Sequence, residues 1–68
     1  MNVYVVMAFN ETGFYVVSVS TNLEIAKNYA EYEFKQRVGA WNIRIYKKIL
    51  DAPQTIEDEI VYTKEKTK

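Results

Sequence analysis

The side chains of this chain that could take part in catalysis carry hydroxyl or carboxylate groups, but the sequence offers no group that would activate them. The 68-residue sequence contains no Cys and no His. Ser18 and Ser20 therefore have no imidazole to activate them as nucleophiles, as covalent catalysis requires. Glu31 and Glu33, two residues apart, point to different sides of a helix. We accordingly expect no enzymatic activity and no bound cofactor.

The acidic run Glu57–Glu59 is the best candidate for a cation site. Its oxygen ligands suit a hard cation, but the run lacks the spaced Asp, Asn and Gly residues of a calcium loop. A solvated loop, whose charge also blocks a sheet edge, explains the same residues. We therefore expect no metal site.

Charged residues are segregated along the sequence although their total is zero. Nine basic residues balance nine acidic ones, which argues against a general polyanion binder. Between Glu33 and Asp51 every charged residue is basic, and from Asp51 to Glu59 every one is acidic. Cations interleaved with aromatic rings on a sheet can clamp single-stranded nucleic acid. The alternative is that Tyr favours strands and that Lys keeps a strand edge soluble.

Four segments are rich in β-branched and aromatic residues or alternate apolar with polar ones, which predicts strands. They are residues 3–9, 14–20, 41–50 and 60–63. The turn Asn10–Gly13 joins the first two as a hairpin, and Pro53 ends the third because it cannot donate to a ladder. The polar residues 64–68 should form a frayed tail, which leaves 1–63 as a single domain.

Residues 21–39 predict the only helix. Thr21 and Glu24 have the spacing of an N-terminal capping box, and Gly39 suits a left-handed residue at the C-terminal end. An apolar stripe that should pack on the sheet consists of Leu23, Ala26, Ala30, Phe34 and Val38. A second stripe that should stay partly open consists of Ile25, Tyr29 and Tyr32.

These elements predict a two-layer α+β sandwich of ββαββ order, with one helix on a mostly antiparallel sheet. Short connections and antiparallel pairing of the third strand with the first give the sheet order 2-1-3-4. On the third strand, Trp41, Ile43 and Ile45 share one side. On the hairpin, the more apolar side should face the helix, and it carries Val3, Val5, Met7, Phe9, Tyr15, Val17 and Val19.

The other side of the sheet should stay uncovered, because one helix covers only one face. Excess apolar surface of this kind marks contact sites, where aromatic residues and Arg are the usual anchors. On this side we expect Arg44, Tyr46 and Lys48 near Tyr4 and Phe14. The candidate partner-binding residues are Tyr4, Tyr29, Tyr32, Arg37, Arg44, Tyr46 and Lys48. The possible ligands are a protein, single-stranded nucleic acid or a second copy of the chain.

The sequence shows no secretory signal and no membrane span. Its first residues lack a basic segment and reach Asn10 and Glu11 too early for a signal peptide. No apolar run approaches the roughly 20 residues of a membrane helix. Because the absence of Cys suits a reducing compartment, we expect a cytoplasmic protein.

The order of hairpin, capped helix and strand resembles that of small phage and low-GC bacterial proteins. The residues that carry this resemblance are Thr21, Leu23, Glu24, Ala26, Ala30 and Glu31. Over roughly residues 3–48 the element order is also similar to that of the small early RNA-polymerase inhibitor of lytic coliphages. The resemblance implies a phage-type protein that binds and inhibits or redirects a host protein, such as RNA polymerase or another nucleic-acid-associated complex.

Overall fold

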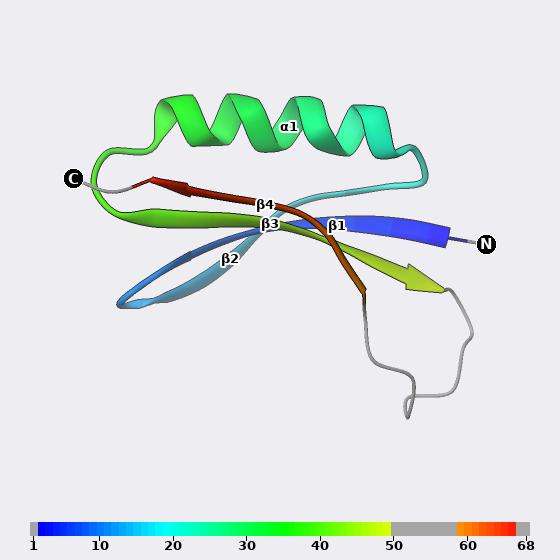
Figure 1. The fold of residues 1–68 in the computed structure, drawn as a ribbon, viewed down its shortest axis with the longest axis horizontal. Coiled ribbons are helices and arrows are strands. Elements are labelled where there is room, and N and C mark those ends of the chain that lie inside the picture. The colour runs from blue at the N-terminus through cyan, green and yellow to red at the C-terminus, as the bar shows by residue number, and fades with distance from the viewer. Residues whose placement is uncertain (1, 50–58, 67–68) are drawn as a thin grey trace.

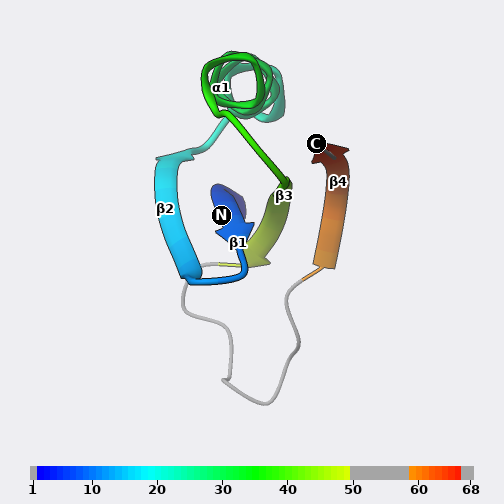
Figure 2. The ribbon, with the colours of Figure 1, turned by 90° about the vertical axis from the view of Figure 1, so that its left-hand side faces the viewer.

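The computed structural model describes residues 2–49 and 59–66 of the chain. Its elements are β1 (Asn2–Asn10), β2 (Gly13–Ser20), α1 (Leu23–Gln36), β3 (Trp41–Ile49) and β4 (Glu59–Lys66). The four strands form one antiparallel sheet in the order β2-β1-β3-β4. Helix α1 lies on one side of this sheet (Figure 1, Figure 2). The predicted α+β fold, with its ββαββ order and its 2-1-3-4 sheet, is confirmed.

The core joins α1 to the two central strands of the sheet. Its buried members are Val6, Ala8, Ala26, Ala30, Ile43 and Ile45. Ala26 and Ala30 have the smallest side chains of the helix stripe, so they let the helix approach the sheet closely. Leu23, Phe34 and Trp41 are partly buried against this cluster. The predicted alternation of β3 is therefore confirmed. The predicted helix stripe is confirmed from Leu23 to Phe34, whereas Val38 lies beyond the end of the helix and is exposed.

The side of β1 that faces the helix is the opposite of the predicted one. Val6 and Ala8 are fully buried under α1, so the alternating residues Val5, Met7 and Phe9 lie on the uncovered side. The prediction chose the more apolar side of the hairpin. Where the helix approaches through alanines, the helix side of β1 carries the small residues Val6 and Ala8, and Met7 and Phe9 lie on the opposite side. Val3 is also buried, but it does not belong to the core cluster.

The hairpin closes through a two-residue loop. Asn10 pairs with Gly13, and its Oδ1 accepts from the Gly13 amide at 3.1 Å. Further along, the register shifts between Val6 and Met7 and leaves Val17 as the extra residue of a β-bulge. Tyr15 and Val17 face the helix as predicted. The other side of β2 carries Phe14, Val16 and Val19, although Val19 was expected on the helix side.

Helix α1 begins at Leu23, and its N-cap is Asn22 rather than Thr21. Asn22 has extended backbone angles, and its Oδ1 accepts from the amides of Glu24 and Ile25 at 2.8 and 3.2 Å. Asn ranks above Thr at this position. The Ser20 hydroxyl donates to the Asn22 carbonyl at 2.8 Å, which orients the capping residue. The predicted capping box is therefore wrong by one residue.

The helix ends at Gln36, three residues before the predicted Gly39. Arg37 is its C-cap, and the Arg37 amide donates to the Glu33 carbonyl at 3.0 Å. Gly39 has a φ of 95°, which other residues rarely adopt, and it turns the chain into β3. Within the described residues, no helix has the length and apolar character needed to cross a membrane.

Strand β4 extends to Lys66, so residues 64–66 are not the predicted frayed tail. The Lys66 ammonium donates to the carbonyls of Phe34 and Arg37 at 3.1 and 2.6 Å. Carbonyls at the end of a helix lack intrahelical donors, and a cation suits them. Contacts with a distant helix therefore order a polar segment that periodicity alone assigns to a tail. Most of the predicted acidic run, up to residue 58, and residues 67–68 lie outside the described residues.

The capping assignment yields a first prediction. We expect Asn22→Ala to lower the free energy of unfolding by about 1 kcal/mol, because two amides of the first turn lose their acceptor. Thr21→Ala is the matched control and should change it by less than about 0.5 kcal/mol. Urea denaturation followed by circular dichroism measures both. A larger loss in Thr21→Ala would show that Thr21, not Asn22, caps the helix.

Candidate functional site

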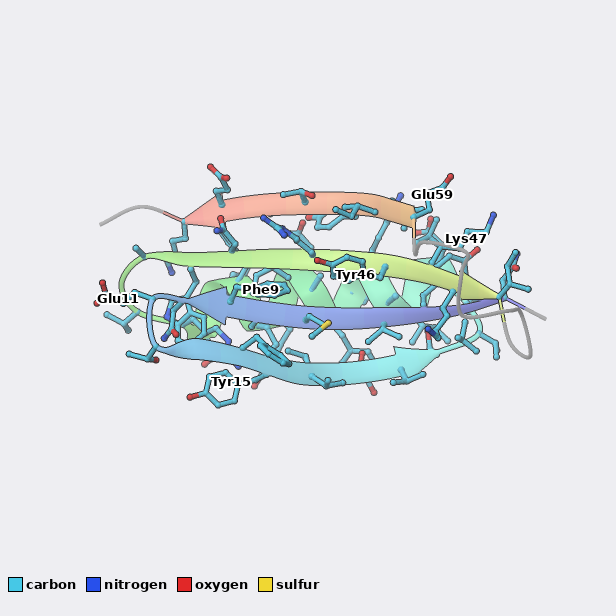
Figure 3. The ribbon with its side chains drawn as sticks, turned by 90° about the horizontal axis from the view of Figure 1, so that it is seen from below. Phe9, Glu11, Tyr15, Tyr46, Lys47 and Glu59 are labelled. Carbon is cyan, nitrogen blue, oxygen red and sulfur yellow. The ribbon has the colours of Figure 1, made fainter. Side chains whose placement is uncertain are left out.

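The side of the sheet opposite α1, called the open face below, is defined by the strand register, and at one end of it Val3 is buried. Cross-strand partners share a side of the sheet, and Val5 lies opposite Tyr46, Met7 opposite Arg44. Figure 3 looks onto this face, with α1 behind the sheet. Its described side chains from the three strands β1, β2 and β3 are Val3, Val5, Met7, Phe9, Phe14, Val16, Val19, Asn42, Arg44, Tyr46 and Lys48. Strand β4 adds Ile60, Thr63 and Glu65.

Phe9 is the centre of an aromatic cluster on the open face. Its ring centroid lies 6.0 Å from that of Phe14 and 6.4 Å from that of Tyr46, the latter in an edge-to-face arrangement. The guanidinium carbon of Arg44 lies 5.0 Å from the centroid of the Phe9 ring, and Nη1 donates to the Tyr46 hydroxyl at 3.4 Å. Three neighbouring strands thus bring three rings and one cation together. Phe9, Phe14, Arg44 and Tyr46 are called the Phe9 cluster below.

The open face is apolar but carries a small positive excess. Among its described residues there are two cations, Arg44 and Lys48, and one carboxylate, Glu65. Arg44 is half-buried by its neighbours, whereas Glu65 is exposed on the edge strand β4. The positive charge therefore lies near the middle of the sheet, and the negative charge lies at its border.

Three of the seven predicted contact residues share the open face. They are Arg44, Tyr46 and Lys48, with Phe14 nearby as predicted. Tyr4 does not join them, because it has the same orientation as Val6 and packs against the core. Tyr4 was predicted near Arg44 because the prediction placed the wrong side of β1 against the helix. The position of Tyr4 near Arg44 is therefore wrong.

Tyr29 and Tyr32 lie in the other layer of the molecule, on α1. Both side chains are exposed, as predicted, and they line a shallow apolar depression with Ile25 and Asn28. This depression is formed by one helix alone and contains no charged residue among those that line it. It is therefore a second apolar patch, separated from the open face by the sheet.

Arg37, which is partly exposed, contacts several groups of its own domain. Its guanidinium carbon lies 4.2 Å from the centroid of the Trp41 ring and 5.7 Å from that of Tyr15. Its Nε lies 3.1 Å from Glu33 Oε2, an ion pair without hydrogen-bond alignment. Trp41 in turn donates from Nε1 to the Val38 carbonyl at 3.0 Å. This stack fastens the end of α1 to β2 and β3.

Sequence reasoning missed Phe9 as a member of the site, because it placed Phe9 in the core. The length of the turn was the available signal. A two-residue loop between Asn10 and Gly13 makes Phe9 and Phe14 direct partners, and partners share a side of the sheet. The contribution of Arg44 was correctly expected from its alternation with Ile43 and Ile45.

The groups with shifted pKa values lie away from the open face, between α1 and β4. The Tyr62 hydroxyl donates to Glu31 Oε1, and the Lys64 ammonium donates to Glu31 Oε2 at 2.8 Å. These bonds, first that of Lys64 and then that of Tyr62, hold the pKa of Glu31 below its ordinary value. Burial, and then the bond to Glu31, raises the pKa of Tyr62 to about 12. Both pKa values move away from neutral pH, and the two bonds link α1 to β4.

The described residues contain no group of three His, Cys, Asp or Glu side chains that could hold a metal ion. Comparisons with protein-family models, with curated proteins and with solved structures found no match to this chain. The open face is therefore interpreted from its own geometry.

The link between α1 and β4 yields a second prediction. Alkaline titration followed by ultraviolet absorbance should show a late tyrosine ionisation near pH 12. Tyr62→Phe should remove this component, and Tyr32→Phe, which alters an exposed hydroxyl, should retain it. The pKa of Tyr62 is raised from 10.0 in the folded protein. The contribution of the Tyr62 hydroxyl to the free energy of unfolding is therefore complete below pH 10 and is lost between pH 10 and about 12.

The raised pKa of Tyr62 also predicts the stability of the Tyr62→Phe variant. At neutral pH the free energy of unfolding of this variant should be lower than that of the wild type by about 1 kcal/mol, a value reduced for the solvent screening of a partly exposed bond. This difference should disappear as the pH rises above 10. A late ionisation that survives in Tyr62→Phe would contradict the assignment.

Proposed function

We propose that this protein is a small cytoplasmic interaction module without enzymatic activity, which binds a protein partner through its open face. The Phe9 cluster is the observation that carries the proposal. It places three rings and an Arg on the side of the sheet that α1 does not cover. Aromatic residues and Arg supply most of the binding energy in protein interfaces, especially when neighbouring apolar residues exclude water.

The charges of the open face define the chemistry of the partner. A partner that covers Arg44 removes the guanidinium from water, which is costly unless a carboxylate meets it. The described carboxylate of this face, Glu65, lies opposite Asn42 at the exposed border of the sheet. The Arg44 guanidinium instead contacts Phe9 and Tyr46. We therefore infer a partner surface on which apolar side chains surround an Asp or a Glu.

Two open faces stacked on each other fit these charges poorly. Around a two-fold axis the same patch of each chain meets its copy. Such a stack would bring the cations Arg44 and Lys48 of both chains into one interface, with Glu65 as its described carboxylate on each side. The charge pattern thus favours a different protein as the occupant of the open face.

A narrower form of the proposal concerns the partner's origin. The partner is a host protein, such as a component of the transcription machinery, which the module inhibits or redirects. This form rests on the resemblance of the element order and of the Thr21–Glu31 pattern to small phage proteins. The open face supports protein binding independently of it.

The proposal predicts the outcome of a capture experiment. The immobilised full chain should retain a stoichiometric protein from a bacterial lysate. The double variant Phe14→Ser/Arg44→Glu should retain at least about tenfold less, because each anchor of this type is typically worth about 2 kcal/mol. Quantitative gel densitometry measures the captured protein.

The helix patch provides the matched control. Tyr29→Ser/Tyr32→Ser removes two exposed rings from α1 and should leave capture unchanged, provided that both variants unfold at similar temperatures. If the helix variant loses capture and the open-face variant keeps it, the contact surface lies on α1. Absence of any stoichiometric partner would count against a protein-binding function.

Single-stranded nucleic acid is a second candidate ligand, favoured by the stacking of Arg44 on Phe9 beside Tyr46. Such a platform can stack bases, and the Arg44 guanidinium within it can contact a phosphate. If this function applies, affinity for a labelled single strand should fall about 2.6-fold when salt rises fourfold, as expected for about one phosphate contact. Fluorescence anisotropy measures this dependence. No binding at low salt would exclude this candidate.

A further inference from the structure

The two edges of the sheet differ in their protection against pairing. Edge strand β4 carries four charged residues, Glu59, Lys64, Glu65 and Lys66. Edge strand β2, Gly13–Ser20, contains no charged residue and no Pro. Proteins normally guard a strand edge with charges, Pro or bulges, because its unpaired backbone groups can bind another strand. Each edge strand has one register shift, so charge is the protection that β2 lacks.

Strand β2 also exposes large apolar side chains on both of its sides. Phe14, Val16 and Val19 are 62%, 58% and 60% exposed on the open face. Tyr15 is 53% exposed on the helix side. A strand that is apolar on both sides and uncharged along its edge is typical of one that another strand covers.

The outer edge of β2 is accessible within the described part of the chain. In the sheet order, β2 is the end strand and has β1 as its only described neighbour. Figure 2 shows α1 above the middle of the sheet, and Figure 3 shows β2 along its border. A further strand can therefore lie beside β2 without displacing α1.

We propose that β2 pairs in an antiparallel manner with β2 of a second copy of this chain. The pair joins two four-stranded sheets into one continuous sheet, with both helices on the same side. A two-fold axis through Tyr15 uses the segment before the bulge at Val17. Phe14 then lies opposite the partner's Val16 on the open face, and Tyr15 lies opposite the partner's Tyr15 on the helix side.

Self-pairing fits β2 because a strand without charge meets no like charge in its copy. Antiparallel partners share a side of the sheet, so this register places Phe14 and Val16 against each other and covers the exposed part of Tyr15. A chain of this length buries little apolar surface alone, and an added strand pair increases it. The proposal goes beyond the proposed function and does not depend on it, since each open face remains available.

The expected dimer is weak because the interface is small. Standard protein interfaces bury about 1,600 Å² in total, and one strand pair with a few side chains buries less. We expect a dissociation constant on the order of micromolar to tens of micromolar. In the dimer the two Phe9 clusters lie side by side on one continuous sheet face.

Sedimentation equilibrium of the full chain over a concentration series tests the proposal. The mass should rise from 8.0 kDa towards twice that value. Val16→Lys places a charge on the pairing segment and should weaken dimerisation at least about tenfold. Ile60→Lys, at an exposed residue of β4, is the matched control and should leave it unchanged. A wild-type chain that stays monomeric up to about 1 mM, well above the expected dissociation constant, would overturn the proposal.

A cross-linking variant tests the register without adding charge. The chain has no Cys, so Tyr15→Cys introduces a single thiol. Residues opposite each other in an antiparallel pair are close enough for a disulfide, so mild oxidation should link Tyr15→Cys chains, whereas Ile60→Cys chains should remain unlinked. This result decides the proposal if Val16→Lys fails to fold. Linking through Ile60→Cys alone, or equal weakening by both Lys variants, would assign the contact to β4 or to no defined edge.

Discussion

Close packing of Ala26 and Ala30 on the sheet determines which side of the sheet becomes the interior. These small residues bring α1 against the small side chains of β1 and against Ile43 and Ile45 of β3. A helix of 14 residues cannot also cover the other side. Met7 and Phe9 of β1 therefore lie on the other side of the sheet, and the Phe9 cluster forms there, whereas Tyr4 packs on the helix side. The position of the candidate site thus follows from the choice of core.

Polar contacts stabilise this small domain in place of the disulfides or metal sites that small domains often need. The chain has no Cys and no His, so neither a disulfide nor an ordinary zinc site can support it. Instead, Glu31 binds Tyr62 and Lys64, and the Lys66 ammonium binds the carbonyls at the end of α1. These contacts attach edge strand β4 to the helix. They also explain why β4 is rich in charge, whereas the other edge strand, β2, has none.

The sequence was sufficient to predict the order of the elements, the sheet order and the inner side of β3, because alternation and turn residues are local signals. It was insufficient for the side of β1. Both sides of that strand are apolar, and only the fit to Ala26 and Ala30 distinguishes them. The sequence also did not predict that Lys64 and Lys66 belong to β4, since their position depends on contacts with groups of the helix about thirty residues away. For the site, alternation was enough to place Arg44 and Tyr46, but Phe9 required the hairpin register.

The central claim is that the side of the sheet bearing Phe14 and Val16 meets solvent while the side bearing Val6 and Ile43 does not. Paramagnetic relaxation by a soluble, uncharged agent, measured by NMR in dilute solution, tests it directly. The account predicts strong relaxation of the Phe14 ring and Val16 methyl protons and almost none for the methyl protons of Val6 and Ile43. Equal protection of all four residues would show that the face is covered, and it would contradict the account.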